Sequence, residues 1–321
     1  MKKINKTLLT LCAAVISASA FTACSTDTET VSETVTITGL NGNKEATEVE
    51  VAYDAQRLVL LDLAALDVID YLGLGDRVVG VASTTIDYLS EYTDTDKYPN
   101  VGNIKTPDVE AVNNVDPDVI FIGGRLTSYY DELSQIAPVV YLTTSADDLV
   151  GSTIENAKTI ASIFGLESKI EETSTAYDAR IEALQTAASG QTAIVGMVTG
   201  GKFNVLGNTS RCSIIGTTIG FNNLGTEYSS DSSTHGDTAS FEYIASENPD
   251  WVFALDRDAA IGTEGATPAA DVLDNELVNG TTAGKNGHVV VLTNSNVWYT
   301  AEGGLQALSI MLLDLESVML A

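Results

Sequence analysis

The sequence is poor in cysteine, histidine and basic residues. The 321 residues include three cysteines and two histidines. There are 16 lysines and arginines but 44 aspartates and glutamates, which gives a net charge of −28. So negative a protein is not expected to bind nucleic acid, and any arginines that gather at one place become conspicuous. With so few cysteines, no intramolecular disulfide is expected.

Motifs of common catalytic chemistries are also missing. The sequence contains no G-x-S-x-G elbow and no His-Glu-x-x-His motif, which argues against a secreted hydrolase. The glycine-rich stretch Gly73–Val78 lacks the third glycine of a dinucleotide loop and lies between a predicted helix and a predicted strand, the wrong context for nucleotide binding. Neither a secreted hydrolase nor a dinucleotide-binding enzyme is therefore expected.

Residues 1–23 have the three regions of a bacterial export signal. A basic start precedes the apolar run Leu8–Ala20, which is too short to span a membrane. The following residues, FTAC, resemble a lipobox, in which Cys24 is lipidated and becomes the new N-terminus. Ordinary signal cleavage near Ala20 or Ala23 is the alternative. Cleavage before Cys24 removes three lysines and changes the net charge from −28 to −31.

Residues 24–36 consist mainly of Ser, Thr, Asp and Glu with isolated valines. Such a segment cannot form a core, and we expect it to be a flexible tether between the membrane and the folded part. The protein would then lie outside the cytoplasm, anchored to the cell membrane by lipid and not spanning it. Cys12 leaves with the signal, so Cys212 is the free cysteine of the folded part.

One stretch of the chain occurs twice. Residues 108–125 read DVEAVNNVDPDVIFIGGR and residues 240–257 read SFEYIASENPDWVFALDR, so an offset of 132 aligns Glu110 with Glu242 and Arg125 with Arg257. Each copy predicts a short amphipathic helix, a Pro-Asp turn that ends it, and a buried strand. The match favours two similar lobes, while a chance similarity between common helix-turn-strand units is the alternative.

The alternation of strands and helices predicts an α/β fold with mostly parallel sheets. We assign residues 37–147 to an N-terminal lobe, 148–190 to a helical connecting segment and 191–321 to a C-terminal lobe. The expected architecture is two Rossmann-like lobes joined by one long helix, with the ligand cleft between them, because ligands bind beyond the carboxyl ends of parallel strands. A long helix is a stiff spacer, so the lobes should move little relative to one another.

Three arginines lie at predicted strand ends or loops: Arg125, Arg211 and Arg257. Arginine carries a permanent charge and a planar fork of donors, which suits it to the recognition of anionic oxygens. Three of them around one cavity would attract a ligand with several negative charges. Taken alone, each arginine is more often part of a surface salt bridge, so the interpretation depends on their convergence.

A histidine and a tyrosine form a second candidate pair. His235 lies in a Ser-rich loop, and Tyr299 follows Trp298, a candidate ligand contact, near the C-terminus. Imidazole and phenolate can occupy two positions on Fe(III), and a ligand with four oxygens would complete six. The alternatives are a solvent-facing histidine and a packing role for Trp298 and Tyr299.

Residues 107–125, 234–257 and 289–304 together resemble the iron-siderophore-binding lipoproteins of bacterial ABC importers, the single-long-helix class of periplasmic binding proteins. The most specific matches are THG before SFEY, LDRDAAIG at residues 255–262, and Trp298-Tyr299 before Gly303-Gly304. The resemblance runs from about Val35 to the C-terminus. It is nearest to the binders of catecholate siderophores, such as enterobactin fragments, bacillibactin and petrobactin.

The resemblance implies roles for the candidate residues. In the family, arginines at the places of Arg125, Arg211 and Arg257 hold catecholate oxygens. In its binders of tetradentate siderophores, a histidine and a tyrosine at the places of His235 and Tyr299 complete the coordination of iron. This sequence departs from the family at Cys212, where an aromatic residue often follows the arginine.

The resemblance also implies a partner and a cargo. Glu110 and Glu242, one per lobe, match positions that meet arginines on the two subunits of an ABC permease dimer. The protein would be a monomer without an intrinsic cofactor, and Fe(III) would be bound through the siderophore.

Two other functions stay open at this point. The same class contains proteins that bind haem or a cobalamin, and Tyr299 or His235 could bind haem iron axially. Three arginines better fit a compact and highly anionic complex. A purely adhesive surface protein would need neither a small-molecule ligand nor charged strand ends.

Overall fold

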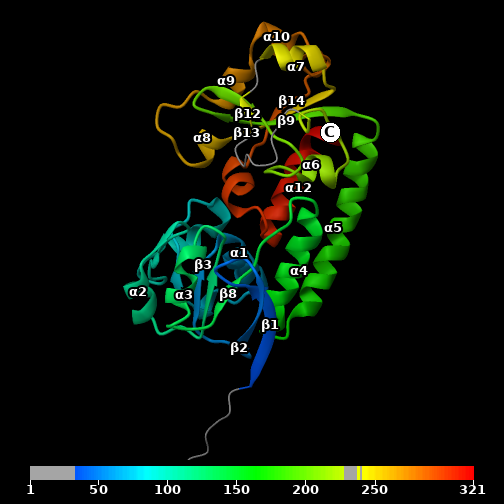
Figure 1. Cartoon of the computed structure of the whole chain (residues 1–321). Helices are drawn as coiled ribbons and strands as arrows, with labels where there is room; N and C mark the ends of the chain where they lie inside the picture. Colours follow the sequence, from blue (N-terminus) through cyan, green and yellow to red (C-terminus); the bar gives the residue numbers. More distant parts are fainter. Residues whose placement is uncertain (1–32, 228–236, 239–240) are drawn as a thin grey trace, which may run out of the picture. The chain divides into compact units, whose positions relative to one another are not determined.

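The computed structural model describes residues 33–227, 237–238 and 241–321, which all belong to one compact unit, Glu33–Ala321 (Figure 1). The expected signal peptide, Cys24 and His235 lie outside the described residues, as does most of the expected tether. The tether was expected to reach residue 36, but strand β1 already begins at Thr34, because Val35 and Ile37 alternate with threonines and turn toward the protein. Among the described residues, no helix is long and apolar enough to cross a membrane.

The N-terminal lobe is built on a parallel sheet in the order β4-β3-β7-β8, preceded by an antiparallel hairpin of β1 and β2. Strands β3 and β7 read LVLL and VIFI and are buried at every position, as expected for strands covered on both faces. The elements are β1 (Thr34–Leu40), β2 (Ala46–Ala52), β3 (Leu58–Leu61), α1 (Leu63–Leu72), β4 (Val78–Val81), β5 (Gly102–Asn103), β6 (Thr106–Pro107), α2 (Val109–Asn114), β7 (Val119–Ile122), α3 (Tyr130–Leu133) and β8 (Val139–Tyr141).

The C-terminal lobe contains a mixed sheet in the order β12-β10-β9-β13-β14. Strands β9, β13 and β14 are parallel, whereas β10 and β12 are antiparallel additions at one edge, and the short β11 pairs with β9. The elements are β9 (Thr192–Thr199), β10 (Lys202–Val205), α6 (Ile214–Thr217), β11 (Asn222–Asn223), β12 (Asp237–Thr238), α7 (Phe241–Glu247), β13 (Trp251–Asp256), α8 (Arg257–Ala260), α9 (Ala269–Leu273), α10 (Glu276–Asn279), α11 (Thr282–Asn286), β14 (Val289–Val291), a π-helix (Val297–Ala301) and α12 (Leu305–Met319).

The repeated stretch forms the same unit twice. Helix α2 leads into β7 and helix α7 leads into β13, so the predicted helix-turn-strand unit is confirmed in both copies. The turns match in detail, because Asp116 and Asn248, which are 132 positions apart, both have left-handed backbones with φ of 45° and 46°. Asp and Asn are the residues other than glycine that tolerate this conformation best.

The aspartate of each Pro-Asp pair explains why that pair recurs. One carboxylate oxygen of Asp118 accepts hydrogen bonds from the backbone N–H groups of Gln56 and Arg57, at 2.7 and 2.9 Å, just before β3. Asp250 binds the backbone N–H and the hydroxyl of Thr192, the first residue of β9, at 2.9 and 2.8 Å. In each lobe, therefore, the aspartate ties the start of its own strand to the start of the parallel neighbour.

The connecting segment consists of two helices, α4 (Leu149–Ser162) and α5 (Glu167–Ala188). They pack side by side in Figure 1, and the break between them contains Gly165, whose φ of 65° a residue with a side chain rarely adopts. Helix α5 is the long helix that leads into β9, as expected.

Helix α12 contacts both lobes, which differs from the assignment of residues 191–321 to the C-terminal lobe alone. It packs against α1, α4 and α5. Because Gly304 precedes it, α12 has no side-chain cap of its own. Asp67 of α1 replaces that cap and accepts hydrogen bonds from the backbone N–H groups of Gln306 and Ala307, both at 2.9 Å.

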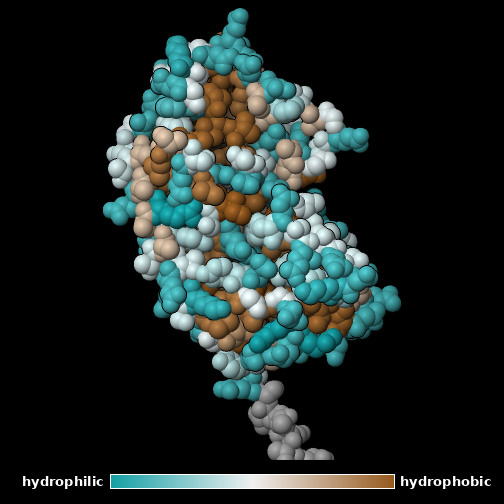
Figure 2. Space-filling view, turned by 180° about the vertical axis from the view of Figure 1, so that it is seen from behind, coloured by the Kyte–Doolittle hydropathy of each residue, from teal (hydrophilic) through white to brown (hydrophobic). Residues whose placement is uncertain are grey.

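A single hydrophobic cluster joins the two lobes. It contains buried side chains of β3 and α1 together with those of α5, β13 and α12, for example Leu60, Leu66, Leu184, Phe253 and Leu308. A shared core of this kind opposes rotation of the lobes, which supports the expectation of limited motion. On the face drawn in Figure 2, hydrophilic side chains cover most of the outer edge, as the charged composition requires.

Candidate ligand-binding site

The π-helix Val297–Ala301 places Trp298 and Tyr299 in different surroundings. Tyr299 is buried but keeps 8% of its surface exposed, and two arginines contact it. Trp298 is fully buried, and its indole N–H donates to Asp314 of α12 at 2.9 Å. The prediction that Trp298 contacts the ligand therefore conflicts with this structure, because the side chain packs in the core and its one polar atom is already bonded.

Arg257 lies at the carboxyl end of β13, as predicted, and its side chain contacts Tyr299. The Nε–H of Arg257 donates to the Tyr299 hydroxyl at 3.1 Å, and Nη1 reaches the Thr199 hydroxyl at 3.2 Å. Asp258 lies 3.5 Å from Nη1 and also binds the backbone of Gly200, so it holds the guanidinium against the end of β9. About 29% of the Arg257 side chain stays exposed.

Arg211 contacts the same tyrosine from another side. Its guanidinium carbon lies 4.3 Å from the centroid of the Tyr299 ring, and Nη1 donates to the Tyr299 backbone oxygen at 2.7 Å. The Nε atom of Arg211 is buried and has no hydrogen-bond partner. An orphaned buried donor is costly, so Arg211 retains capacity for an oxygen from outside the protein.

Arg125 belongs to the N-terminal lobe and follows β7. Desolvation first, and then repulsion by Arg211, lower the pKa of Arg125, while the proximity of Tyr299 and Asp62 acts in the opposite direction. Arg125 and Arg211 therefore act on one another electrostatically, although they come from two lobes, and Arg257 contacts the same Tyr299. Together with Tyr299 they provide a cationic region that suits an anionic ligand.

Cys212 directly follows Arg211 in the chain. Its side chain is 1% exposed, and burial raises the pKa of its thiol well above the usual value. A buried neutral thiol is a poor metal donor. His235, the second predicted iron ligand, lies outside the described residues.

Two carboxyl groups beside the arginines were not singled out from the sequence. Asp62 follows β3 and caps α1, and Glu302 follows the π-helix and accepts a hydrogen bond from the backbone N–H of Cys212 at 3.3 Å. Burial raises the pKa of both, that of Glu302 to about 7, although Arg211 counteracts this at Glu302. The rule that identified Arg125, a charged residue shortly after a buried strand, could also have identified Asp62.

The same two carboxyl groups line a cavity of about 120 Å³. It lies at the carboxyl ends of β3, β7 and β8, and Glu302 and Gly303 also line it. Its other lining residues come mainly from α1, α4 and the loop after β8, and they include Ala64, Val68, Phe121, Thr143, Thr144 and Asn156.

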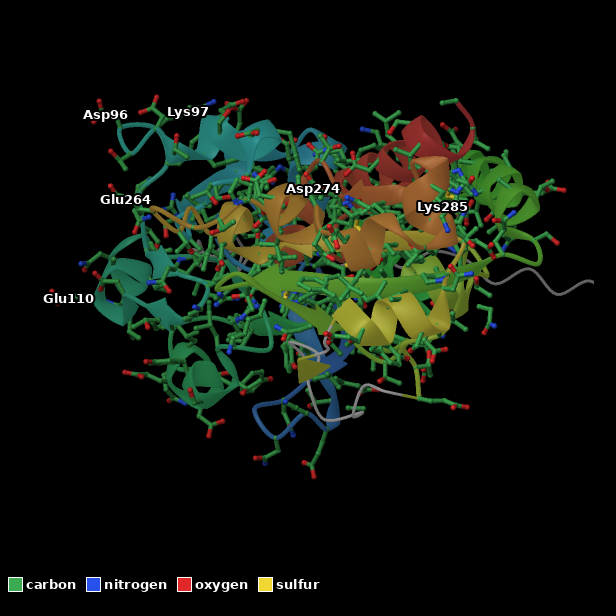
Figure 3. All side chains as sticks on the ribbon, turned by 90° about the horizontal axis from the view of Figure 1, so that it is seen from above. Asp96, Lys97, Glu110, Glu264, Asp274 and Lys285 are labelled. Carbon is green, nitrogen blue, oxygen red and sulfur yellow. The ribbon has the colours of Figure 1, made fainter. Side chains whose placement is uncertain are left out.

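Glu110 and Glu242 take equivalent places near the starts of α2 and α7. Both are exposed, and Glu110 projects from the edge of the molecule in Figure 3. Their equivalence follows from the repeat and says nothing by itself about a partner.

Comparison with known proteins places this geometry in a family. The periplasmic binding protein family matches residues 58–295. The petrobactin-binding protein YclQ of Bacillus subtilis (strain 168) is 35% identical over 270 residues, which cover 83% of each chain. The ferric-anguibactin-binding protein FatB of Vibrio anguillarum is 28% identical over 269 residues, which cover 81% of each chain.

Solved structures agree with this result. The crystal structure of YclQ superimposes with a TM-score of 0.79 at 34% identity and covers 89% of this chain and 98% of that one. The catecholate-siderophore binding protein VctP of Vibrio cholerae also reaches a TM-score of 0.79 at 34% identity, covering 89% of this chain and all of its own. These relatives are binding proteins and not enzymes, and the chain belongs to the periplasmic binding protein family.

Proposed function

We propose that this protein captures a ferric catecholate siderophore outside the cytoplasm and delivers it to an ABC permease for iron uptake. The observation that carries the proposal is the contact of Arg211 and Arg257 with Tyr299, together with the electrostatic interaction of Arg125 with Arg211 and Tyr299. The relatives support it, since YclQ is named as a petrobactin-binding protein, FatB as a ferric-anguibactin-binding protein and VctP as a catecholate-siderophore binding protein.

The arginines would bind the ligand through its oxygens. Catecholate oxygens bound to Fe(III) keep part of their negative charge, and guanidinium groups offer them paired N–H donors. The unpartnered Nε of Arg211 is one such donor. The iron is cargo, and it would enter the site inside the siderophore.

Tyr299 would supply one oxygen directly to the iron. Its hydroxyl must release a proton to become a phenolate, and that oxygen already accepts a hydrogen bond from the Nε–H of Arg257 at 3.1 Å. His235 would supply the second protein ligand. Two protein ligands and four siderophore oxygens complete six positions on Fe(III).

Delivery requires a membrane anchor and a docking surface. We propose that Cys24 carries the lipid, and that Glu110 and Glu242 bind arginines on the two subunits of a permease dimer while the binding protein stays a monomer. Glu110→Gln with Glu242→Gln should then reduce uptake of the radiolabelled ferric complex by cells and leave its affinity for the purified protein unchanged. Unchanged uptake would exclude this docking role.

Titration of the protein with two ferric complexes tests the ligand class. We expect a ferric bis-catecholate, and not a ferric hydroxamate, to quench the fluorescence of Trp251 and Trp298. Haem at equal concentration serves as a competitor, and displacement by haem would favour the alternative of a haem-binding protein. Failure of both complexes to bind would contradict the proposal.

Absorption spectroscopy tests the role of Tyr299. A phenolate bound to Fe(III) gives a ligand-to-metal charge-transfer band, which should shift in Tyr299→Phe as affinity falls. Tyr243→Phe, which changes a tyrosine whose hydroxyl binds the Leu224 backbone, is the matched control. If Tyr299→Phe keeps the wild-type spectrum and affinity, Tyr299 is not an iron ligand.

A further inference from the structure

The cavity lined by Asp62 and Glu302 has no role in the function proposed above. Its volume is about 120 Å³, whereas one water needs roughly 10–15 Å³ of such space. It therefore has room for a short chain of several heavy atoms. Gly123 lets the Asp62 carboxylate lie close to the backbone of the cavity wall, since a Cβ atom at this position would be only 2.8 Å from that carboxylate.

The two carboxyl groups interact electrostatically with the neighbouring arginines, Asp62 with Arg125 and Glu302 with Arg211. Asp62 caps α1 through the backbone N–H of Ala65 at 3.2 Å, and Glu302 accepts from the N–H of Cys212 at 3.3 Å. Within the part of the chain that the structure describes, no lysine or arginine forms an ion pair with either group. A carboxylate that has lost water without gaining an ion pair is unfavourable, and burial accordingly raises both pKa values.

The cavity adjoins the arginine region. Gly124 lines the cavity and is followed directly by Arg125, and Glu302 interacts electrostatically with Arg211. Positive and negative groups thus stand beside each other. An anionic part of a ligand is attracted to the arginines and repelled from the carboxylates, whereas a cationic part is directed to the cavity.

We propose that this cavity binds a positively charged, amine-bearing arm of the siderophore, with Asp62 and Glu302 accepting hydrogen bonds from its ammonium group. The inference rests on the proposed function and specifies its ligand further, as a catecholate whose linker carries a protonated amine. It also fixes one orientation of the ligand, with the ferric catecholate centre on the arginines and the amine toward the sheet of the N-terminal lobe.

A competing explanation is that the carboxylates only orient Arg125 and Arg211. That role would affect every anionic ligand equally, whereas an amine site affects only ligands that carry the amine. Two ferric bis-catecholates that differ in one linker atom, a protonated secondary amine in one and a methylene in the other, separate the two explanations.

The wild-type protein should bind the amine complex at least about tenfold more tightly, as expected for a hydrogen bond to a charged group. Glu302→Gln should reduce this preference and leave the affinity for the methylene complex unchanged. Asp62→Asn should act in the same direction, and because asparagine is also a good N-cap, it should keep α1 intact. Glu132→Gln, which changes an exposed glutamate of α3, is the control.

Each result decides a separate question. Equal binding of both complexes by the wild-type protein would overturn the inference and leave the proposed function standing, and this comparison needs no variant. An equal loss for both complexes in Glu302→Gln, with thermal unfolding unchanged, would assign Glu302 to the positioning of Arg211 and also overturn the inference. If neither complex binds the wild-type protein, the proposed function itself fails.

Discussion

Asp67 connects the two lobes, and its removal should destabilise the protein strongly. Its carboxylate is fully buried and accepts hydrogen bonds from the N–H groups of Gln306 and Ala307 and from the hydroxyl of Tyr88. Asp67→Ala leaves three donors without their acceptor and α12 without a cap. Since an unsatisfied buried donor costs about 1–3 kcal/mol, and α12 and Tyr88 can relax in part, we expect a loss of about 3–5 kcal/mol in the free energy of unfolding.

The contribution of Asp67 should also depend on pH. Burial raises its pKa from 3.8 to about 6, so the folded state binds the proton more tightly than the unfolded state does. Stability from this group is therefore fully present below about pH 4 and is lost as the pH rises through 6. Proton linkage with these two pKa values gives about 1.4 kcal/mol more stability at pH 5 than at pH 8. Asp67→Asn should remove this part of the pH dependence.

Urea unfolding followed by circular dichroism at pH 5, 6, 7 and 8 measures both effects. Asp96→Asn, which changes an exposed aspartate (Figure 3), is the control and should follow the wild-type curve. A loss below about 1 kcal/mol in Asp67→Ala would refute the capping role. Parallel pH curves for the wild-type protein and Asp67→Asn would refute the assigned shift in pKa.

Three further predictions follow from the buried contacts. Trp298→Phe removes the indole N–H that donates to Asp314 and should lower the free energy of unfolding by about 2–3 kcal/mol, measured in urea. The affinity for the ligand should change less than about threefold, because Trp298 does not reach the site. A large loss of affinity with unchanged stability would show that Trp298 contacts the ligand after all. Asp118→Ala and Asp250→Ala should each lower the free energy of unfolding by about 2 kcal/mol, since each removes two hydrogen bonds at the start of a neighbouring strand. Unequal losses would argue against equivalent roles of the two aspartates. The Cys212 thiol should resist iodoacetamide until the protein unfolds, because it is buried and protonated, and mass spectrometry of the labelled peptides locates any earlier reaction.

Local sequence patterns were sufficient for much of the fold. The apolar runs that became β3, β7 and β13, and the Pro-Asp turns before two of them, were recognisable because strand burial and helix termination depend on neighbouring residues. The same patterns could not reveal the antiparallel edge strands β10 and β12, since pairing depends on which strands meet. Nor could they show that α12 docks on Asp67, a residue 239 positions before Gln306.

The site was predicted in part. Arg125 and Arg257 were recognisable as charged residues at or shortly after the ends of buried strands, and the offset of 132 related them to each other. Trp298 was misassigned, because neighbours in a π-helix point in different directions and the sequence does not show which one faces the core. Glu302 was missed because its importance comes from burial beside Arg211.

The sequence by itself determined the family, the α/β class, the repeated unit and a set of arginines proposed to bind an anion. These properties depend on residue type and short spacing, which a linear chain displays directly. The tertiary structure decided which side chains meet: that Arg211 and Arg257 contact Tyr299, that Arg125 of the other lobe interacts with Arg211 electrostatically, and that two carboxyl groups line a cavity beside them. Contacts of this kind join residues far apart in the chain, and they exist only once packing has placed the two sheets and α12 around a common core.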